Sequence, residues 1–142
     1  LSFNQNWSLD SGLELQHVLN NKNLDGSEDL SIGGSSGVKL YPSGELSAEN
    51  GYLLNLELFY NLPEVKSLRQ QLSLFYDLGR AEMAENNTGF EARTLQDLGV
   101  GYHLNYQDFF LKMHWAVKID DEDIQSESDY DDKLLLQAGL LF

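Results

Sequence analysis

Apolar and polar residues alternate along most of the chain, and this pattern constrains the fold more than any other feature. In residues 109–119, one set of alternate side chains is wholly apolar, whereas Lys112, His114 and Lys118 belong to the other set. A period of two indicates β-strands with one apolar and one polar face. Similar segments lie at residues 52–61, 71–79, 95–106 and 133–142, with weaker candidates at 1–9 and 12–21. The pattern predicts an all-β chain of about seven strands and no helix.

The connections between these strands alternate in length. Short ones are expected at residues 10–12, 62–66 and 106–108, and long polar ones at 21–51, 80–94 and 120–132. Tight turns at one rim and long loops at the other are typical of an antiparallel up-and-down β-barrel in a bacterial outer membrane. A soluble β-sandwich would sort its loops in this way only by chance.

Composition excludes several classes of protein. The chain of 142 residues is long enough for one domain, and its net charge of -14 would repel nucleic acid. The absence of cysteine excludes disulfides and thiolate chemistry. The mean hydropathy of -0.37 suits a soluble protein, but the strands of a membrane barrel also average to low hydropathy. Because the chain starts at Leu1 without a signal peptide, we expect a processed chain or a piece of a longer one.

The long segment at residues 31–52 is rich in glycine and serine, yet it carries an apolar and basic cluster at its centre. The cluster consists of Val38, Lys39, Leu40 and Tyr41. Loops of more than about 12 to 15 residues are usually functional or disordered. We expect its glycines to allow positive φ angles and close backbone approach; they are Gly33, Gly34, Gly44 and Gly51. A phosphate-binding loop is a poor alternative, because no helix follows.

This segment resembles the motif that identifies the outer-membrane transporters of two-partner secretion, of the hemolysin activator and filamentous hemagglutinin transporter type. The matching residues are Gly33, Gly34, Val38, Lys39, Leu40, Tyr41, Pro42, Gly44, Glu45, Glu49, Gly51, Tyr52, Leu53, Glu57 and Leu58. A second family signature, Phe-x-Asp-x-Gly, is matched by Phe75, Asp77 and Gly79. Lys39 stands where the family usually has Arg, and Leu40 where it has Gly or Ala.

The resemblance implies that residues 1–142 form the C-terminal part of a translocator barrel, about seven of roughly 16 strands. The long loop at about 21–51 would fold into the lumen. The implied function is a pore in the bacterial outer membrane that exports a large secreted protein, of hemolysin or adhesin type, without ATP. Such a protein is not an enzyme and needs no cofactor. Its expected partners are the secreted exoprotein, outer-membrane lipid and the barrel-assembly machinery, and no nucleic acid.

The resemblance also implies roles for particular residues. Lys39, at the loop tip, would pair with Asp77 on the facing wall, and strand parity independently turns Asp77 away from lipid. Glu57 would support the loop or line the lumen, although a hydrated carboxylate is an equal alternative. The last strand would carry the signal read by the assembly machinery, in Leu136, Ala138, Leu140 and Phe142.

Other ionisable groups suggest no site. Residues 120–132 hold eight acidic residues without the spacing of a calcium loop, so a solvated loop is favoured. His17, His103 and His114 share no metal-ligand spacing along the sequence, and we expect no metal.

Three alternatives stay open at this point. An insertase of the same superfamily, which folds other barrels, shares the loop motif in kind. A soluble lipocalin-like barrel would show similar alternation with its apolar face turned inward. An extracellular β-sandwich hydrolase is a more distant alternative, because no pair of carboxylates is placed by a recognisable motif.

Overall fold

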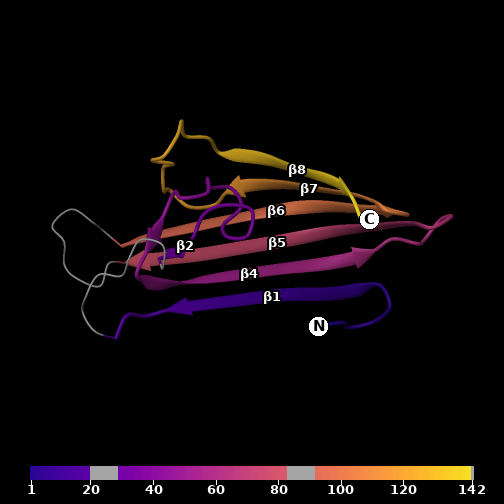
Figure 1. Cartoon of the computed structure of the whole chain (residues 1–142), viewed down its shortest axis with the longest axis horizontal. Helices are drawn as coiled ribbons and strands as arrows, with labels where there is room; N and C mark the ends of the chain where they lie inside the picture. Colours follow the sequence, from indigo (N-terminus) through magenta and orange to yellow (C-terminus); the bar gives the residue numbers. More distant parts are fainter. Residues whose placement is uncertain (20–28, 83–91, 142) are drawn as a thin grey trace.

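The computed structural model describes residues 1–19, 29–82 and 92–141, and these residues form an antiparallel meander (Figure 1). One sheet contains six long strands, in which every strand pairs with its neighbour in the order β1-β4-β5-β6-β7-β8. Their bounds are β1 Trp7–Gln16, β4 Asn50–Asn61, β5 Leu68–Glu82, β6 Arg93–Tyr106, β7 Phe109–Lys118 and β8 Asp132–Leu140. A separate ribbon pairs β2, Leu30–Ser31, with β3, Ser47–Ala48. The predicted all-β antiparallel class is confirmed.

No helix occurs among the described residues, and so none of them belongs to a helix long and apolar enough to cross a membrane. The strands form because alternating β-branched, aromatic and leucine side chains suit a pleated surface.

Two tight turns require positive φ angles, at Lys66 and Ser67 before β5 and at Gln107 before β7. Both lie in the connections that the sequence predicts to be short.

The predicted turn at residues 10–12 is wrong. Strand β1 runs through this segment, and Asp10 and Gly12 pair in register with Glu57 and Asn55 of β4. The chain turns earlier, where the Asn4 side-chain oxygen accepts hydrogen bonds from the amides of residues 6 and 7. An asparagine that bonds to the backbone two or three residues ahead is a common turn former. Strand β1 therefore includes residues 7–9 of the first weak candidate and 12–16 of the second, and residues 20–21 of the second lie outside the described residues.

Long and short connections lie at opposite ends of the sheet (Figure 1). The turns between β4 and β5 and between β6 and β7 lie at the right-hand end, together with both termini. The β7–β8 connection, residues 119–131, and the segment around β2 lie at the left-hand end. The order from β1 to β8 is long, short, long, short, long, as the sequence predicts for these connections.

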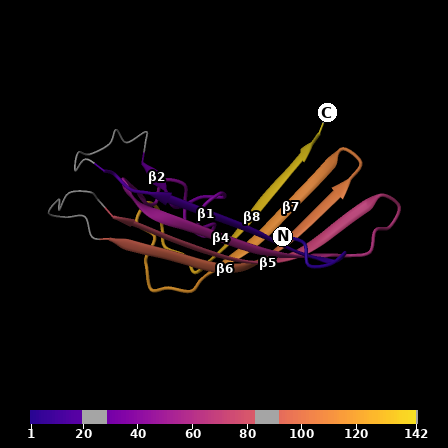
Figure 2. The ribbon, with the colours of Figure 1, turned by 90° about the horizontal axis from the view of Figure 1, so that it is seen from below.

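Burial on the sheet is the reverse of that in a soluble protein. Leu72, Leu74 and Trp115 are 47%, 51% and 50% exposed on one face, whereas Asp77 and Asp97 on the other face are fully buried. Register places the leucines and the tryptophan on a shared outer face. Figure 2 shows the sheet curved like a trough, with the segment around β2 on its concave side. The outer face therefore presents an apolar band to its surroundings, and the inner face carries the two buried carboxylates.

The hydrophobic core lies between the inner face and residues 29–49, which we call the 29–49 loop. The loop contributes Leu30, Ile32, Val38, Leu40, Tyr41, Leu46 and Ala48. The strands contribute Leu53, Phe75, Ala81, Leu95 and Ala116, and the β7–β8 connection contributes Ile124. The core thus holds the loop against the wall of the trough.

Candidate functional site

The 29–49 loop has a compact conformation that depends on its glycines. Gly34 and Gly44 have φ angles of 101° and 82°, which favour glycine over other residues. Gly33 packs so closely on the loop that an added Cβ would lie 2.1 Å from the carbonyl oxygen of Pro42. The amide of Gly34 donates to the carbonyl of Tyr41 at 3.0 Å, which closes the turn. These contacts close a turn from Gly34 to Tyr41, and the turn directs the side chain of Lys39 toward the inner wall.

Lys39 forms a buried ion pair with Asp77 of β5. Its Nζ lies 2.9 Å from Oδ2 and 3.2 Å from Oδ1 of Asp77. The Nδ2 atom of Asn55 on β4 donates to the same carboxylate at 2.7 Å and to the Gly37 carbonyl at 2.9 Å. Because the Asp77 side chain is fully buried, it relies on these donors in place of water. The structure thus brings together the two residues that the sequence analysis paired.

Each residue of the Phe-x-Asp-x-Gly signature contacts the 29–49 loop. The Phe75 ring lies under the Lys39 ammonium, with 4.4 Å between Nζ and the ring centroid, so it adds a cation–π contact. Gly79 lies directly beneath Ile32, and a Cβ there would come within 2.2 Å of the Ile32 Cγ2. The signature therefore supplies an aromatic ring and a carboxylate that contact Lys39, and a glycine that leaves space for Ile32.

Asp97 of β6 is a second buried carboxylate, and the sequence analysis gave it no role. It lies opposite Asp77 in the β5–β6 register, and its Oδ2 accepts a hydrogen bond from the Leu40 amide at 2.5 Å. The Tyr130 hydroxyl of the β7–β8 connection donates to the Leu40 carbonyl at 3.1 Å. The pairing of Asp77 with Asp97 could have been anticipated only from the β5–β6 register.

Glu45 joins the loop to the β7–β8 connection. Its Oε2 accepts hydrogen bonds from the Ser126 amide at 3.0 Å and hydroxyl at 2.6 Å, and its Oε1 accepts from the Gln125 amide at 2.8 Å. Arg93 of β6 completes the site with Nη1 3.1 Å from Oε1. Burial alone would raise the pKa of Glu45, but these donors together hold the pKa below its ordinary value. Sequence reasoning identified Glu45 as a motif residue and missed its partners.

The β7–β8 connection is more than a solvated acidic loop, which corrects the expectation for residues 120–132. Tyr41 donates its hydroxyl to Asp120 Oδ1 at 2.6 Å and to the Glu122 carbonyl at 3.0 Å. Burial raises the pKa of Tyr41, and the adjacent Asp120 carboxylate raises it further, so the hydroxyl keeps its proton. Arg93 Nε also lies 3.0 Å from Glu122 Oε2. The connection therefore packs over the loop and contacts Tyr41 through the Asp120 carboxylate and the Glu122 carbonyl.

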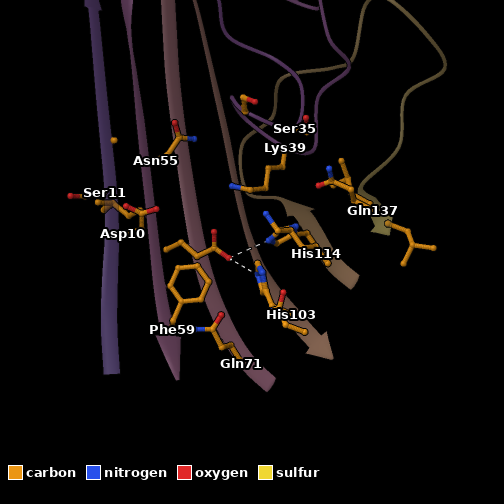
Figure 3. A pocket seen from close by; sticks show the side chains of 18 residues that line it. Asp10, Ser11, Ser35, Lys39, Asn55, Phe59, Gln71, His103, His114 and Gln137 are labelled. Carbon is orange, nitrogen blue, oxygen red and sulfur yellow. Dashed lines mark hydrogen bonds and ion pairs between the residues drawn. The ribbon is translucent and has the colours of Figure 1, made fainter. Parts of the chain in front are cut away.

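Glu57 of β4 contacts two histidines instead of the loop. His103 Nε2 on β6 and His114 Nε2 on β7 lie 3.3 Å and 3.2 Å from Glu57 Oε1, and the Ser73 hydroxyl donates to the same oxygen at 2.6 Å. Glu57, His103 and His114 border a cavity of about 880 Å³ whose wall also includes Lys39. Figure 3 shows His103 and His114 converging from neighbouring strands.

His103 and His114 are distant in sequence, but the β6–β7 register makes them diagonal neighbours, because Gly101 pairs with His114 and His103 with Lys112. The tight turn at residues 107–108 is the signal that could have found this proximity. His17 follows β1 and is exposed.

The C-terminal residues have only part of their environment described. Leu136 and Leu140 are 65% and 58% exposed on the outer face of β8, and Ala138 lies between them, opposite Leu111. Phe142 lies outside the described residues. Their role as an assembly signal stays a prediction.

Comparison with known proteins identifies the family. Residues 1–104 match the family described as haemolysin secretion/activation protein ShlB/FhaC/HecB. The chain belongs to this family. It is also similar to the heme/hemopexin transporter protein HuxB of Haemophilus influenzae, with 32% identity over 89 residues. That match covers 59% of this chain and 16% of the relative. HuxB of strain 86-028NP is 30% identical over 92 residues, or 61% of this chain and 16% of that protein.

Family membership explains the reversed burial on the sheet. The chain is part of a β-barrel in the outer membrane of a Gram-negative bacterium, as the sequence analysis predicted. The lipocalin alternative is wrong, because the large apolar side chains of the sheet face outward. The chain spans only about a sixth of the length of the curated relatives that it matches. No solved structure matches the chain.

Proposed function

We propose that this chain forms part of the wall of a pore that exports a large secreted protein across the outer membrane, and that the 29–49 loop is fixed inside the lumen. The carrying observation is the buried Lys39–Asp77 ion pair, which fixes the loop tip to the inner face of an outer-membrane sheet. A loop held in this position narrows and shapes the space through which an extended polypeptide would pass. No covalent chemistry is required for such transport, and the relatives are named as transporters.

The rest of the barrel must come from other strands. Within the described part of the chain, β8 pairs only with β7, and β1 pairs with β4 and with Ser2 of the N-terminal turn. An open sheet edge in lipid would leave backbone groups unpaired, at a cost of several kcal/mol per group. We therefore propose that residues 1–142 are one part of a barrel of roughly 16 strands. Outer-membrane lipid would contact the outer face, and the barrel-assembly machinery would insert it.

The substrate is proposed to be a secreted partner of the hemolysin or adhesin type, moved without ATP. A second candidate is a partner that acts on heme or hemopexin, because the matched relatives are named for that transport. The two candidates differ in the passenger, and the same pore would serve either.

Secretion by the full transporter that contains this chain tests the proposal. Asp77→Asn keeps the size of the side chain but removes its charge, so we expect less exoprotein in the medium at an unchanged level of folded transporter in the outer membrane. Lys112→Ala, on the same face, is the matched control and should secrete normally. A fall in other outer-membrane proteins with normal exoprotein secretion would favour the insertase alternative. Undiminished secretion by Asp77→Asn would contradict the role of the ion pair.

A further inference from the structure

The side chains of Glu57, His103 and His114 contact one another on the inner face, beside the Phe75 ring that supports Lys39. We propose that these three side chains bind one divalent transition-metal ion, and that their donor set fits Zn²⁺. Two imidazoles and one carboxylate are a common protein ligand set for zinc when a further position is left to water. The inference does not depend on what the barrel transports.

The distances between the donor atoms suit a common metal ion. Glu57 Oε1 lies 3.3 Å from His103 Nε2 and 3.2 Å from His114 Nε2, and all three donor atoms lie within 4.8 Å of one another. Zinc binds such atoms at about 2.0 to 2.2 Å, so tetrahedral ligands are separated by about 3.3 to 3.5 Å. An ion can therefore be accommodated with small side-chain adjustments and no change in strand register.

The contacts on Glu57 are crowded for ordinary hydrogen bonds. Ser73 Oγ, His103 Nε2 and His114 Nε2 all approach the single oxygen Oε1. A carboxylate oxygen offers about two lone pairs, and the Ser73 hydroxyl at 2.6 Å already occupies one direction. Two more donors must then compete for what remains. A cation between the imidazoles and the carboxylate satisfies both nitrogens as neutral ligands and leaves the serine to orient the carboxylate.

A glycine makes room for the two imidazoles. Gly101 pairs with His114 in the β6–β7 register, and an added Cβ would lie 2.9 Å from His114 Cδ2 and 3.2 Å from His103 Nε2. It would also lie 2.1 Å from Ser73 Oγ. Any other residue at position 101 would therefore force apart the rings that now converge.

The site is partly shielded and has an entry path. The side chains of Glu57, His103 and His114 are 17%, 10% and 15% exposed. The cavity of about 880 Å³ beside them has room for a water ligand and for the approach of an ion. Of the nearby cations, Lys39 is paired with Asp77, and Lys112 is exposed on the cavity wall, where Asp10 also lies. The local charge therefore permits a dication.

Metal binding to the purified, detergent-folded protein that contains this chain tests the inference. After removal of metal, Co²⁺ is added as a spectroscopic probe, and Zn²⁺ is then used to displace it. We expect one Co²⁺ per chain with the visible absorption of low coordination number, and its loss on adding Zn²⁺. Glu57→Gln, His103→Gln and His114→Gln should each weaken binding by about 100-fold or more, since even outer-sphere changes cost 10 to 100-fold. His17→Gln, at an exposed histidine, is the matched control.

A second measurement uses only the wild-type protein, so it does not depend on the folding of a variant. In the wild-type protein, Zn²⁺ should protect His103 and His114, but not His17, from diethylpyrocarbonate. The inference is overturned if the wild-type protein binds no Co²⁺ at micromolar concentrations, or if His17→Gln reduces binding as much as the cluster variants. Equal modification of the three histidines with and without Zn²⁺ would also overturn it.

Discussion

Asp77 and Asp97 lie directly opposite each other on β5 and β6, and neither side chain is exposed to solvent. Like charges at opposed positions of a sheet destabilise it. Here the Lys39 ammonium lies on Asp77, and the Leu40 amide donates to Asp97. The 29–49 loop therefore satisfies a part of the wall that would be unfavourable without it. These carboxylates can be tested by the stability of the folded barrel protein that contains this chain.

Lys39→Ala and Asp77→Ala should each lower the free energy of unfolding by about 3 to 5 kcal/mol, because each leaves a buried charge without its partner. The double variant should lose little more than either single one. Lys39→Arg should stay near wild type, since a guanidinium can bind both carboxylate oxygens. Urea unfolding measures all four. Lys112→Ala, which is exposed, is the control, and simple additivity of the two alanine effects would contradict the pairing.

Asp97→Asn should be neutral or stabilising, because it keeps an acceptor for the Leu40 amide and removes the charge opposite Asp77. Asp97→Leu should instead cost about 1 to 3 kcal/mol, the cost of a buried amide without an acceptor. The same unfolding measurement compares the two. A larger loss for asparagine than for leucine would show that the charge itself is required.

Glu45 should make the attachment of the 29–49 loop depend on pH. Its pKa in the folded protein lies below its unfolded value, so its stabilising contribution is complete above the unfolded pKa, about 4.5. The contribution falls as the pH is lowered toward the folded pKa. Unfolding free energies measured between pH 7 and pH 3 should therefore decline more in wild type than in Glu45→Gln. Parallel curves for the two proteins would contradict the assignment.

Trp115→Arg should destabilise the barrel by about 2 to 4 kcal/mol if the residue lies near the membrane midplane, because it places a charge on the lipid-facing side. Lys112→Arg, on the inner face of the same strand, should change stability by less than about 0.5 kcal/mol. The free energy of unfolding of the two variants, measured by reversible folding in lipid vesicles, compares them. Equal effects on both faces would contradict the orientation of the sheet.

Asp120→Asn should weaken the contact between the β7–β8 connection and the loop, because Asp120 accepts hydrogen bonds from the Tyr41 hydroxyl and the Gln96 amide. Hydrogen bonds to a charged group are worth about 1.5 to 3 kcal/mol each. Asp121→Asn, one residue later and exposed, should be silent. Limited proteolysis of the connection reports the difference, and equal protection of the two variants would refute it.

The sequence predicted most of the sheet because a strand between lipid and a barrel lumen alternates apolar residues that face lipid with residues that face the lumen. It failed at residues 10–12, which look like a turn but belong to a strand: Asp10 and Gly12 pair with Glu57 and Asn55 on the inner face, and Ser11 lies on the outer face. Without apolar residues at alternate positions, this part of the strand lacks the pattern that distinguishes a strand from a loop. The assembly role of Phe142, which would be tested by deleting it, is unaffected by this result.

The Lys39–Asp77 pair could be anticipated from two motifs, but the other contacts of the site could not. Arg93 with Glu45 and His114 with Glu57 are pairs of residues on separate elements, and no local signal fixes their distance. They depend on strand register summed over several hairpins. Only once the turns are known does the sequence place His103 beside His114.

The contact between Glu45 and Ser126 spans 81 residues of the chain. We expect it to form after β4, β5, β6 and β7 lie in register, because these long strands separate its two ends. Contacts between residues far apart in sequence form slowly, since the entropy of loop closure must be met first. We therefore expect the 29–49 loop to dock late in folding, after the neighbouring hairpins have formed in the correct register.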